Sequence, residues 1–370
     1  MKVLGFMTGT SLDAVDMAVL ETDGEEILEL GPAGSKPLED ETRALVKQAT
    51  AEALQWPMGA PEPAIFAEVA AAMAREHIIA ADDFMAQHDI LPVDLTVVGL
   101  QGQTVLHEPP MPGRPVGRTV QLIDAQAVAN ALGVAVAYDF RTGDVAAGGQ
   151  GAPLAPVYHE ALVRYSNMHT PMAVLNLGGV GNVTLVDDDG RLEAFDTGPA
   201  NGMLDLWMQE KANLPYDFKG LNAKAGTARG DIVEAYLAHP YFQMTGPKSL
   251  DRFDFSLAPC EGLSIEDGAA TLTAFAAETV ARGVKACSRF PLRLVVTGGG
   301  RLNPTLMGQI QSKLSLHVLS AEEAHWRGDT VEAEAFAYLA ARALMGLPIS
   351  FPGTTGVPHP MSGGRIVMPA

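Results

Sequence analysis

The sequence contains only two cysteines, Cys260 and Cys287, among 370 residues. Two isolated cysteines cannot build a disulfide framework or supply the ligands of a structural zinc site, and they are typical of a reducing cytosol. No run of about eighteen apolar residues occurs, so the sequence does not predict a membrane-spanning helix. The first seven residues lead directly into a turn, which does not match a signal peptide. We therefore expect a cytoplasmic protein.

Basic residues are scarce, with 25 Lys and Arg against 44 Asp and Glu, and the formal net charge is −19 at pH 7. This balance disfavours nucleic acid and anionic membranes as partners. An acidic protein that binds a nucleotide must hold the phosphates with backbone N–H groups, a cation such as Mg²⁺ and a few basic side chains. Glycine-rich turns let backbone N–H groups approach a phosphate, so we expect such turns if the ligand is a nucleotide.

The length of the chain predicts two domains rather than one compact core. We place the first at residues 1–136 plus 345–370 and the second at residues 137–344. Two strand–turn–strand segments, residues 3–20 and 173–186, resemble one another. Hydrophobic spacing also predicts strands at 95–100, 134–138, 192–196 and 292–296, helices at 39–89 (interrupted at 57–63), 124–132, 201–207, 304–313 and from 330, and a surface tail at 351–370.

The turn after the first strand is rich in small and polar residues. Small residues let the backbone approach a phosphate, and Asp13 and Asp16 are candidates for binding Mg²⁺ through water. An exposed hairpin turn with local hydrogen bonds is an equally good explanation of this segment alone. It is not a P-loop, because no Gly-Lys-Ser/Thr follows. The predicted ATP-binding residues of this turn are Gly9, Thr10, Ser11, Leu12, Asp13, Ala14, Val15 and Asp16, with Asp13 as the metal candidate.

Two further glycine-rich segments follow predicted strands. A second phosphate turn is predicted at Gly178 and Gly179, with Asn182. Gly298, Gly299 and Gly300 would let a base or ribose lie against the backbone, with Asn303 as its hydrogen-bond partner. Taken singly, these are explained as a tight hairpin and a strand-to-helix loop. Their order along the chain favours a nucleotide clamp, and the lack of G-x-G-x-x-G after the first strand disfavours a dehydrogenase.

Longer blocks make a resemblance specific. Residues 5–16, GFMTGTSLDAVD, resemble the pattern G-x-M-S-G-T-S-x-D-G-x-D, and residues 139–154 match D-F-R-x-x-D-x-A-x-G-G-x-G-A-P-L. These patterns, with shorter blocks at 102–109, 195–201, 246–249, 297–300 and 331–337, are similar to those of the anhydro-N-acetylmuramic acid kinase family over nearly the whole chain. The resemblance implies the two-domain α/β fold of actin and sugar kinases (ribonuclease H-like), with ATP and sugar in an interdomain cleft. It also implies ATP and Mg²⁺ as cofactors, an anhydro amino sugar as substrate and a homodimer.

The resemblance also assigns the chemistry. Asp196 matches the family's general base, which takes a proton from a water that attacks C1 of the sugar while O6 departs to the γ-phosphorus. The alternative is that Asp196 caps the following helix. The residues expected to bind the substrate are Gln103, Arg141, Gly151, Asn201 and Glu332.

Two of these substrate residues have structural alternatives. The Arg141 guanidinium suits an anionic substituent such as a lactyl carboxylate, but an ion pair with Asp139 or Asp144 explains it equally well. Glu332 either contacts water or metal, or complements a helix dipole. For His107, a structural role is favoured over a substrate contact.

Thr8, Ala14, Gln101 and Ala200 depart from the family pattern, and residues 250–255 diverge from it. Gln101 and Ala200 leave the shape of the sugar pocket open. Two other functions also remain open: a kinase of the same fold that acts on another anhydro sugar such as levoglucosan, and a non-enzymatic, actin-like nucleotide clamp. Release of ADP that depends on the sugar separates these possibilities.

Overall fold

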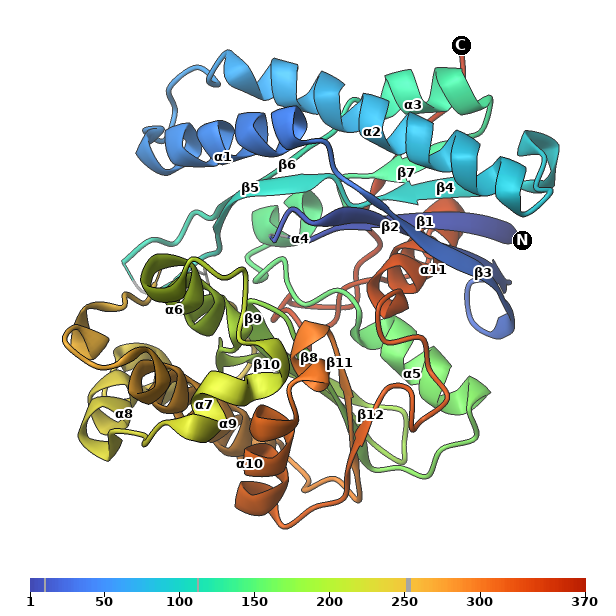
Figure 1. The fold of residues 1–370 in the computed structure, drawn as a ribbon. Helices are drawn as coiled ribbons and strands as arrows, with labels where there is room; N and C mark the ends of the chain where they lie inside the picture. The colour runs from blue at the N-terminus through green and yellow to red at the C-terminus, as the bar shows by residue number, and fades with distance from the viewer. Residues whose placement is uncertain (10, 112, 251–253) are drawn as a thin grey trace. The chain divides into compact units, whose positions relative to one another are not determined.

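The protein is described by a computed structural model that covers residues 1–9, 11–111, 113–250 and 254–370. The chain divides into two compact units, Met1–Asn167 with Thr330–Ala370, and Met168–Asp329. The two ends of the chain thus lie in one unit (Figure 1). Among the described residues, no helix is both long enough and apolar enough to cross a lipid bilayer.

The first unit is built on a six-stranded sheet with the order β13-β7-β4-β1-β2-β3. Strands β1, β2 and β3 are antiparallel, whereas β4 runs parallel to β1 and β7 runs parallel to β4. The elements of this unit are β1 (Lys2–Thr8), β2 (Ala14–Thr22), β3 (Ile27–Pro37), α1 (Asp40–Gln55), α2 (Ile65–Gln87), η1 (Pro92–Asp94), β4 (Val97–Leu100), β5 (Gln103–Glu108), β6 (Arg118–Leu122), α3 (Ala125–Leu132), β7 (Val136–Tyr138), α4 (Thr142–Ala146), α5 (Pro156–Tyr165), α11 (Val331–Met345) and β13 (Arg365–Val367).

The second unit contains a five-stranded sheet with the order β10-β9-β8-β11-β12. Here β8, β9 and β10 are antiparallel, β11 runs parallel to β8, and β12 runs parallel to β11. The elements are β8 (Met172–Leu177), β9 (Val180–Val186), β10 (Leu192–Pro199), α6 (Asn201–Ala212), η2 (Phe218–Gly220), α7 (Leu221–Ala225), α8 (Gly230–Leu237), η3 (Pro240–Gln243), η4 (Ala258–Cys260), α9 (Ile265–Ala286), β11 (Leu294–Thr297), η5 (Gly299–Leu302), α10 (Pro304–Leu314) and β12 (Val318–Ser320).

The two sheets share one topology. In each, three antiparallel strands that follow one another in the chain are extended from the first strand by two parallel strands. Among the described strands of these two sheets, β13, added antiparallel to β7, has no counterpart. This repeated unit confirms the predicted two-domain α/β fold of the actin/sugar-kinase class. The resemblance between the segments at 3–20 and 173–186 is therefore a repeat of structure.

A pair of glycines fixes the packing of α11 in the first unit. Gly5 of β1 and Gly99 of β4 lie side by side in the parallel register. A Cβ atom at Gly5 would lie 2.1 Å from the carbonyl oxygen of Ala333, and one at Gly99 would lie 2.3 Å from that of Phe336. Because neither strand has a side chain here, α11 packs backbone against backbone, and its first turn lies against the middle of β1.

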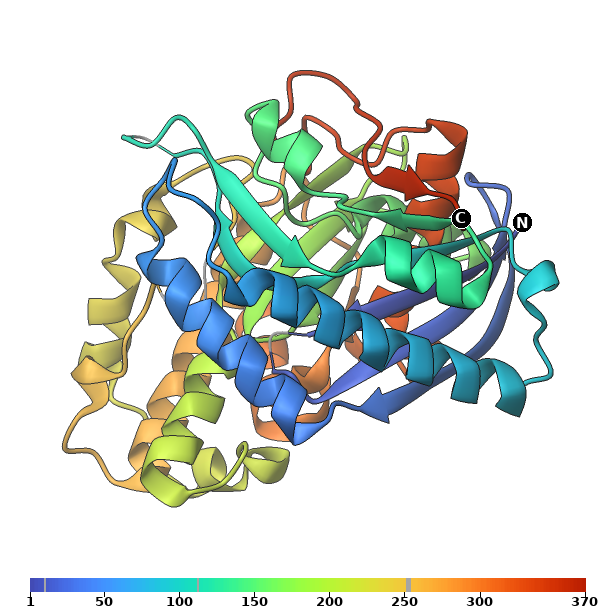
Figure 2. The ribbon, with the colours of Figure 1, turned by 90° about the horizontal axis from the view of Figure 1, so that it is seen from above.

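The opposite face of this sheet carries the apolar core of the first unit. Leu4 and Phe6 alternate with Gly5 along β1, and they pack with buried residues of α1, α2 and α3. Figures 1 and 2 show α1 and α2 running side by side over the strands. Alternation along one strand thus separates a glycine face for α11 from an apolar face for the other helices.

The structure also corrects several expectations. The domain boundaries differ, since α5 and α11 pack against each other and α11 packs on β1, β2 and β4, which places residues up to 167 and from 330 in the first unit. The tail is not only a surface segment, because β13 joins the sheet. Strands β3, β5 and β6 and helix α9 were not expected from the sequence. β10 continues to Pro199, so Asp196 lies within the strand instead of ending it.

Candidate active site

The first predicted phosphate turn joins β1 to β2. Leu12 adopts a positive φ of 61°, and its N–H donates to the carbonyl of Gly9 (3.2 Å). The side chains of Leu12 and Val15 are buried in the core, so only their backbone is available to a ligand. Asp13 is exposed, while Asp16 accepts a hydrogen bond from the hydroxyl of Ser35 (2.7 Å). Ser11 is exposed and Gly9 and Ala14 are partly exposed, whereas Thr10 lies outside the described residues.

Four residues discussed in the sequence analysis lie close together in the first unit: Arg141, Gly151, Glu332 and His107. Arg141 donates from Nη1 to the carbonyl oxygen of Gly151 (2.7 Å). Burial raises the pKa of Glu332 to about 7, and the nearby charges of Arg141 and Asp16 respectively lower and raise it. Burial and the Arg141 charge lower the pKa of His107 to about 3, so this imidazole is neutral. A cation, a neutral imidazole and a carboxyl group that can be protonated near pH 7 therefore lie together.

The ion-pair alternatives for Arg141 involve carboxylates that have other partners. Asp139 pairs with Arg365 (3.2 Å), and the Asp144 carboxylate accepts from the N–H of Gly151 (2.6 Å) and the hydroxyl of Thr355 (2.6 Å). Ligand binding by Arg141 stays a prediction.

Buried polar atoms occur at the ends of the central strands of both units. Thr8 Oγ1 lies on the last residue of β1, and Gln101 Oε1 lies on the residue after β4. Asn176 Oδ1 and Thr297 Oγ1 lie at the ends of the paired strands β8 and β11. Within the described residues, none of these atoms has a hydrogen-bond partner, and neither does Gln103 Oε1. Leaving a buried polar atom unpaired costs about 1–3 kcal/mol, so these positions are suited to polar ligands or water.

In the second unit, three segments far apart in the sequence are brought together. Gly298 packs against the end of β8, where a Cβ atom would lie 2.3 Å from Asn176 Oδ1. Asn201 donates from Nδ2 to the carbonyl of Leu177 (3.0 Å) and lies beside Gly300. The carbonyl oxygens of Gly178 and Gly179 accept from the N-terminus of α6. The second turn, the third loop and the start of α6 therefore form one cluster, with Gly299 exposed within it.

Asp196 lies next to this cluster, because β10 pairs it with Asn182 of β9, and the strand register is irregular between Asp196 and Gly198. The Asp196 side chain is buried, and its Oδ2 accepts a hydrogen bond from the N–H of Leu250 (2.8 Å). Helix α6 begins at Asn201 and its N-cap is Ala200, without a side-chain cap. The alternative that Asp196 caps this helix is therefore wrong.

The sequence pattern did not identify the residues that surround Asp196. The Tyr241 hydroxyl donates to the Asp196 carbonyl oxygen (2.5 Å), and the Asp196 N–H donates to the carbonyl of Lys248 (2.9 Å). Lys248 Nζ donates to the carbonyls of Tyr241 and Met244 (both 3.1 Å). Burial lowers the pKa of Lys248, and the charge of Asp196 opposes this shift. The match of residues 246–249 to the family pattern indicated this region, but it did not indicate a role for Lys248.

Asn303 has a structural task that the sequence analysis did not assign to it. Its Oδ1 accepts from the N–H groups of Thr305 and Leu306, so it caps α10. A nucleotide contact for Asn303 remains a prediction.

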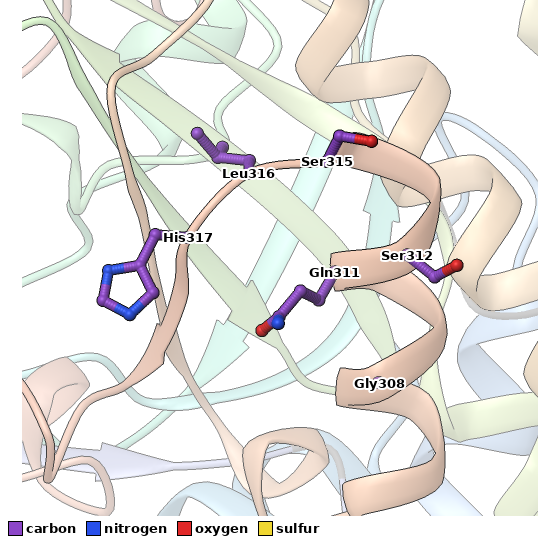
Figure 3. A pocket seen from close by; sticks show the side chains of 6 residues that line it. All are labelled: Gly308, Gln311, Ser312, Ser315, Leu316 and His317. Carbon is purple, nitrogen blue, oxygen red and sulfur yellow. The ribbon is translucent and has the colours of Figure 1, made fainter.

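A surface hollow of about 520 Å³ lies at the other end of α10. Figure 3 shows Gln311 and His317 facing this hollow, while Ser312 points away from Gln311 on the helix; Gly308, Ser315 and Leu316 complete its lining. The lining begins at Gly308, about 7.5 Å along the helix from Asn303, and includes no residue of the glycine cluster. The hollow is therefore separate from the glycine cluster.

Comparison with known proteins identifies close relatives over the full length. Residues 1–369 match the family model "Anhydro-N-acetylmuramic acid kinase". The anhydro-N-acetylmuramic acid kinase of Phenylobacterium zucineum is 56% identical over 369 residues, covering 100% of each chain. That of Caulobacter vibrioides is 55% identical over 367 residues, covering 99% of each. A ligand-bound xylulose kinase from Lactobacillus acidophilus is a distant structural neighbour, with 10% identity and a TM-score of 0.43 over 100% of this chain and 94% of that chain.

Proposed function

Because the chain belongs to the anhydro-N-acetylmuramic acid kinase family, we propose that it opens 1,6-anhydro-N-acetylmuramic acid with water and phosphorylates O6 from ATP. The product is N-acetylmuramic acid 6-phosphate, formed in the recycling of cell-wall peptidoglycan. The observation that carries this proposal is the buried carboxylate of Asp196, which a backbone N–H holds in place next to the second glycine turn.

The mechanism uses one base for two coupled bond changes. Asp196 removes a proton from a water molecule, and the water oxygen forms a bond to C1 as the C1–O6 bond breaks. O6 forms a bond to the γ-phosphorus, and the bond from that phosphorus to the bridging oxygen breaks to release ADP. The second hydrogen of the water stays on the new C1 hydroxyl, and Asp196 returns its proton to solvent.

The other predicted residues bind and orient in this proposal. The first turn and the second turn hold phosphate groups through their backbone, and the third loop holds the nucleoside. Arg141 pairs with the lactyl carboxylate, while Gln103, Gly151, Asn201 and Glu332 bind the sugar. The oxygen-rich side chains of Asp13 and Asp16 suit Mg²⁺, which when bound would neutralise phosphate charge.

Location and assembly belong to the same proposal. A cytoplasmic location agrees with the use of ATP and with two cysteines that are both free and buried. A homodimer follows from the sequence resemblance.

Release of ADP with a panel of sugars tests the function. We expect release with 1,6-anhydro-N-acetylmuramic acid and little release with levoglucosan, with free N-acetylmuramic acid or without sugar. A preference for levoglucosan would instead support the related kinase, and release without sugar would support a nucleotide clamp. In ¹⁸O-water, promptly analysed product should carry label on the C1 hydroxyl and none on the phosphate, and label on the phosphate would contradict the mechanism.

A further inference from the structure

The C-terminal tail contacts the segment that holds Arg141. The N–H of Gln150 donates to the carbonyl of Thr355 (2.7 Å), and the Thr355 hydroxyl donates to Oδ2 of Asp144 (2.6 Å). Thr355 has no exposed surface, and Asp144 is 3% exposed. Thr355, in the tail that the sequence predicts to lie on the surface, is thus part of the buried interior of the first unit.

Asp144 links the tail to the arginine. Its other oxygen, Oδ1, accepts from the N–H of Gly151 (2.6 Å), and the carbonyl of the same glycine accepts from Nη1 of Arg141 (2.7 Å). Three hydrogen bonds therefore run in series from the Thr355 hydroxyl through the Asp144 carboxylate and the backbone of Gly151 to the guanidinium. Both hydrogen bonds to the carboxylate are charge-assisted, the stronger class in proteins.

The glycines of this loop leave it little freedom to shift. A Cβ atom at Gly149 would lie 2.2 Å from Asp144 Oδ1 and 2.7 Å from Cγ1 of Val357. Gly151 has a φ of +70°, and a Cβ atom there would lie 2.6 Å from Cγ2 of Val145. The loop is thus packed against both Asp144 and the tail, so a change in either is transmitted to the Gly151 carbonyl.

We propose that Asp144 and Thr355 are positioning residues that fix the Arg141 guanidinium for a sugar bearing a carboxylate. Bidentate pairing of a guanidinium with a carboxylate depends on the orientation of its plane, which a fixed carbonyl acceptor sets. The tail thereby determines selectivity between anionic and neutral anhydro sugars. This inference rests on the proposed function, because Arg141 is assigned to the sugar there.

Equilibrium binding by calorimetry tests the inference without requiring turnover. The probes are 1,6-anhydro-N-acetylmuramic acid, which carries the carboxylate, and 1,6-anhydro-N-acetylglucosamine, which lacks it. Thr355→Val removes the hydroxyl at nearly constant volume and should weaken binding of the carboxylate sugar about tenfold, or about 1.4 kcal/mol. Binding of the neutral sugar and of ATP should change less than twofold. Thr355→Ser should restore binding.

A neighbouring residue supplies the matched control. Thr354 is also buried, but its hydroxyl bonds only locally with Phe351 in the described structure. Thr354→Val should therefore leave the affinity for both sugars unchanged, even if it lowers stability. An equal loss for both sugars in Thr355→Val, or the same selective loss in Thr354→Val, would show a general packing effect and overturn the inference.

A double-mutant cycle with Arg141→Ala tests the connection itself. If Thr355 acts through Arg141, Thr355→Val should cost no further affinity for the carboxylate sugar once Arg141 is replaced. Full additivity would overturn the inference. Failure of the proposed function appears differently, as the absence of sugar-dependent ADP release from the unaltered protein.

Discussion

At the residue scale, two carboxyl groups of the candidate site occupy different environments. The Asp196 carboxylate accepts a hydrogen bond from the backbone N–H of Leu250. Glu332 is partly exposed, and desolvation raises its pKa to about 7 although the charge of Arg141 opposes this shift.

Asp196→Asn tests the base directly. The amide keeps an oxygen that can accept from Leu250, so the fold and ATP binding should persist. Turnover should fall about 10²–10⁴-fold, which corresponds to about 3–5 kcal/mol of barrier. Stopped assays of sugar-dependent ADP release measure this. The control is Asp188→Asn, because Asp188 is an exposed aspartate in the turn at the far end of the same strand pair. If the turnover of Asp196→Asn lies within about threefold of that of this control, the assignment is wrong.

Glu332 predicts a dependence of stability on pH. Its pKa lies above the ordinary value of 4.5 in the folded protein, so between pH 4.5 and about 7 the folded state keeps a proton that the unfolded chain has lost. Stability contributed at this site therefore falls as pH rises through that window. Relative to the unaltered protein, Glu332→Gln should gain about 1–3 kcal/mol in free energy of unfolding between pH 5 and pH 8. Urea unfolding at pH 5 and at pH 8 measures this gain. If the difference in free energy of unfolding between Glu332→Gln and the unaltered protein is the same at both pH values, as expected for the exposed control Glu68→Gln, the prediction is wrong.

At the element scale, the glycine face under α11 predicts a large asymmetry among glycine substitutions. Gly99→Ala places a Cβ atom 2.3 Å from the carbonyl oxygen of Phe336, so the helix must move off the sheet. We expect a loss of about 3 kcal/mol or more in the free energy of unfolding, together with loss of sugar binding as Glu332 moves. Gly308→Ala in α10 meets no atom within 4 Å and should stabilise by about 0.5–1 kcal/mol. Similar effects of the two substitutions on the denaturation midpoint would contradict this account.

The same elements show what could be predicted from the sequence. The first hairpin, α3, α10 and α11 are strongly periodic or clearly capped, and they were predicted close to their observed bounds. β13 has three residues, and it forms because it pairs with β7 at the edge of the sheet. Such pairing depends on the tertiary fold, so a local sequence pattern does not predict it. Gly5 and Gly99 were visible, but only the register places them side by side. Lys248 lay in a recognised block, yet its role depends on carbonyl groups that the fold brings to it.

At the scale of the whole molecule, chain continuity differs between the two units. The second unit is one continuous segment, Met168–Asp329, whereas the first needs Thr330–Ala370 in addition to Met1–Asn167. The returning segment supplies α11, which packs on β1, β2 and β4, and β13, which pairs with β7. It also supplies Glu332 and Thr355, so the stability of the first unit and the candidate sugar-binding residues that this unit carries depend on the same segment.

A truncation after Asp329 should therefore affect the two units unequally. Without α11, the glycine face of β1 and β4 and the apolar residues around it are exposed to water, and the first unit loses buried area that nothing else covers. The second unit keeps all its strands and helices. Hydrogen exchange measured by mass spectrometry should show lost protection in the β1 and β4 peptides and retained protection in the β8 and β11 peptides. A separate fragment of residues 168–329 should show the same protection in β8 and β11. Protection of β1 and β4 that survives the truncation would mean that the first unit folds without α11, and the glycine face would then have no part in holding it together.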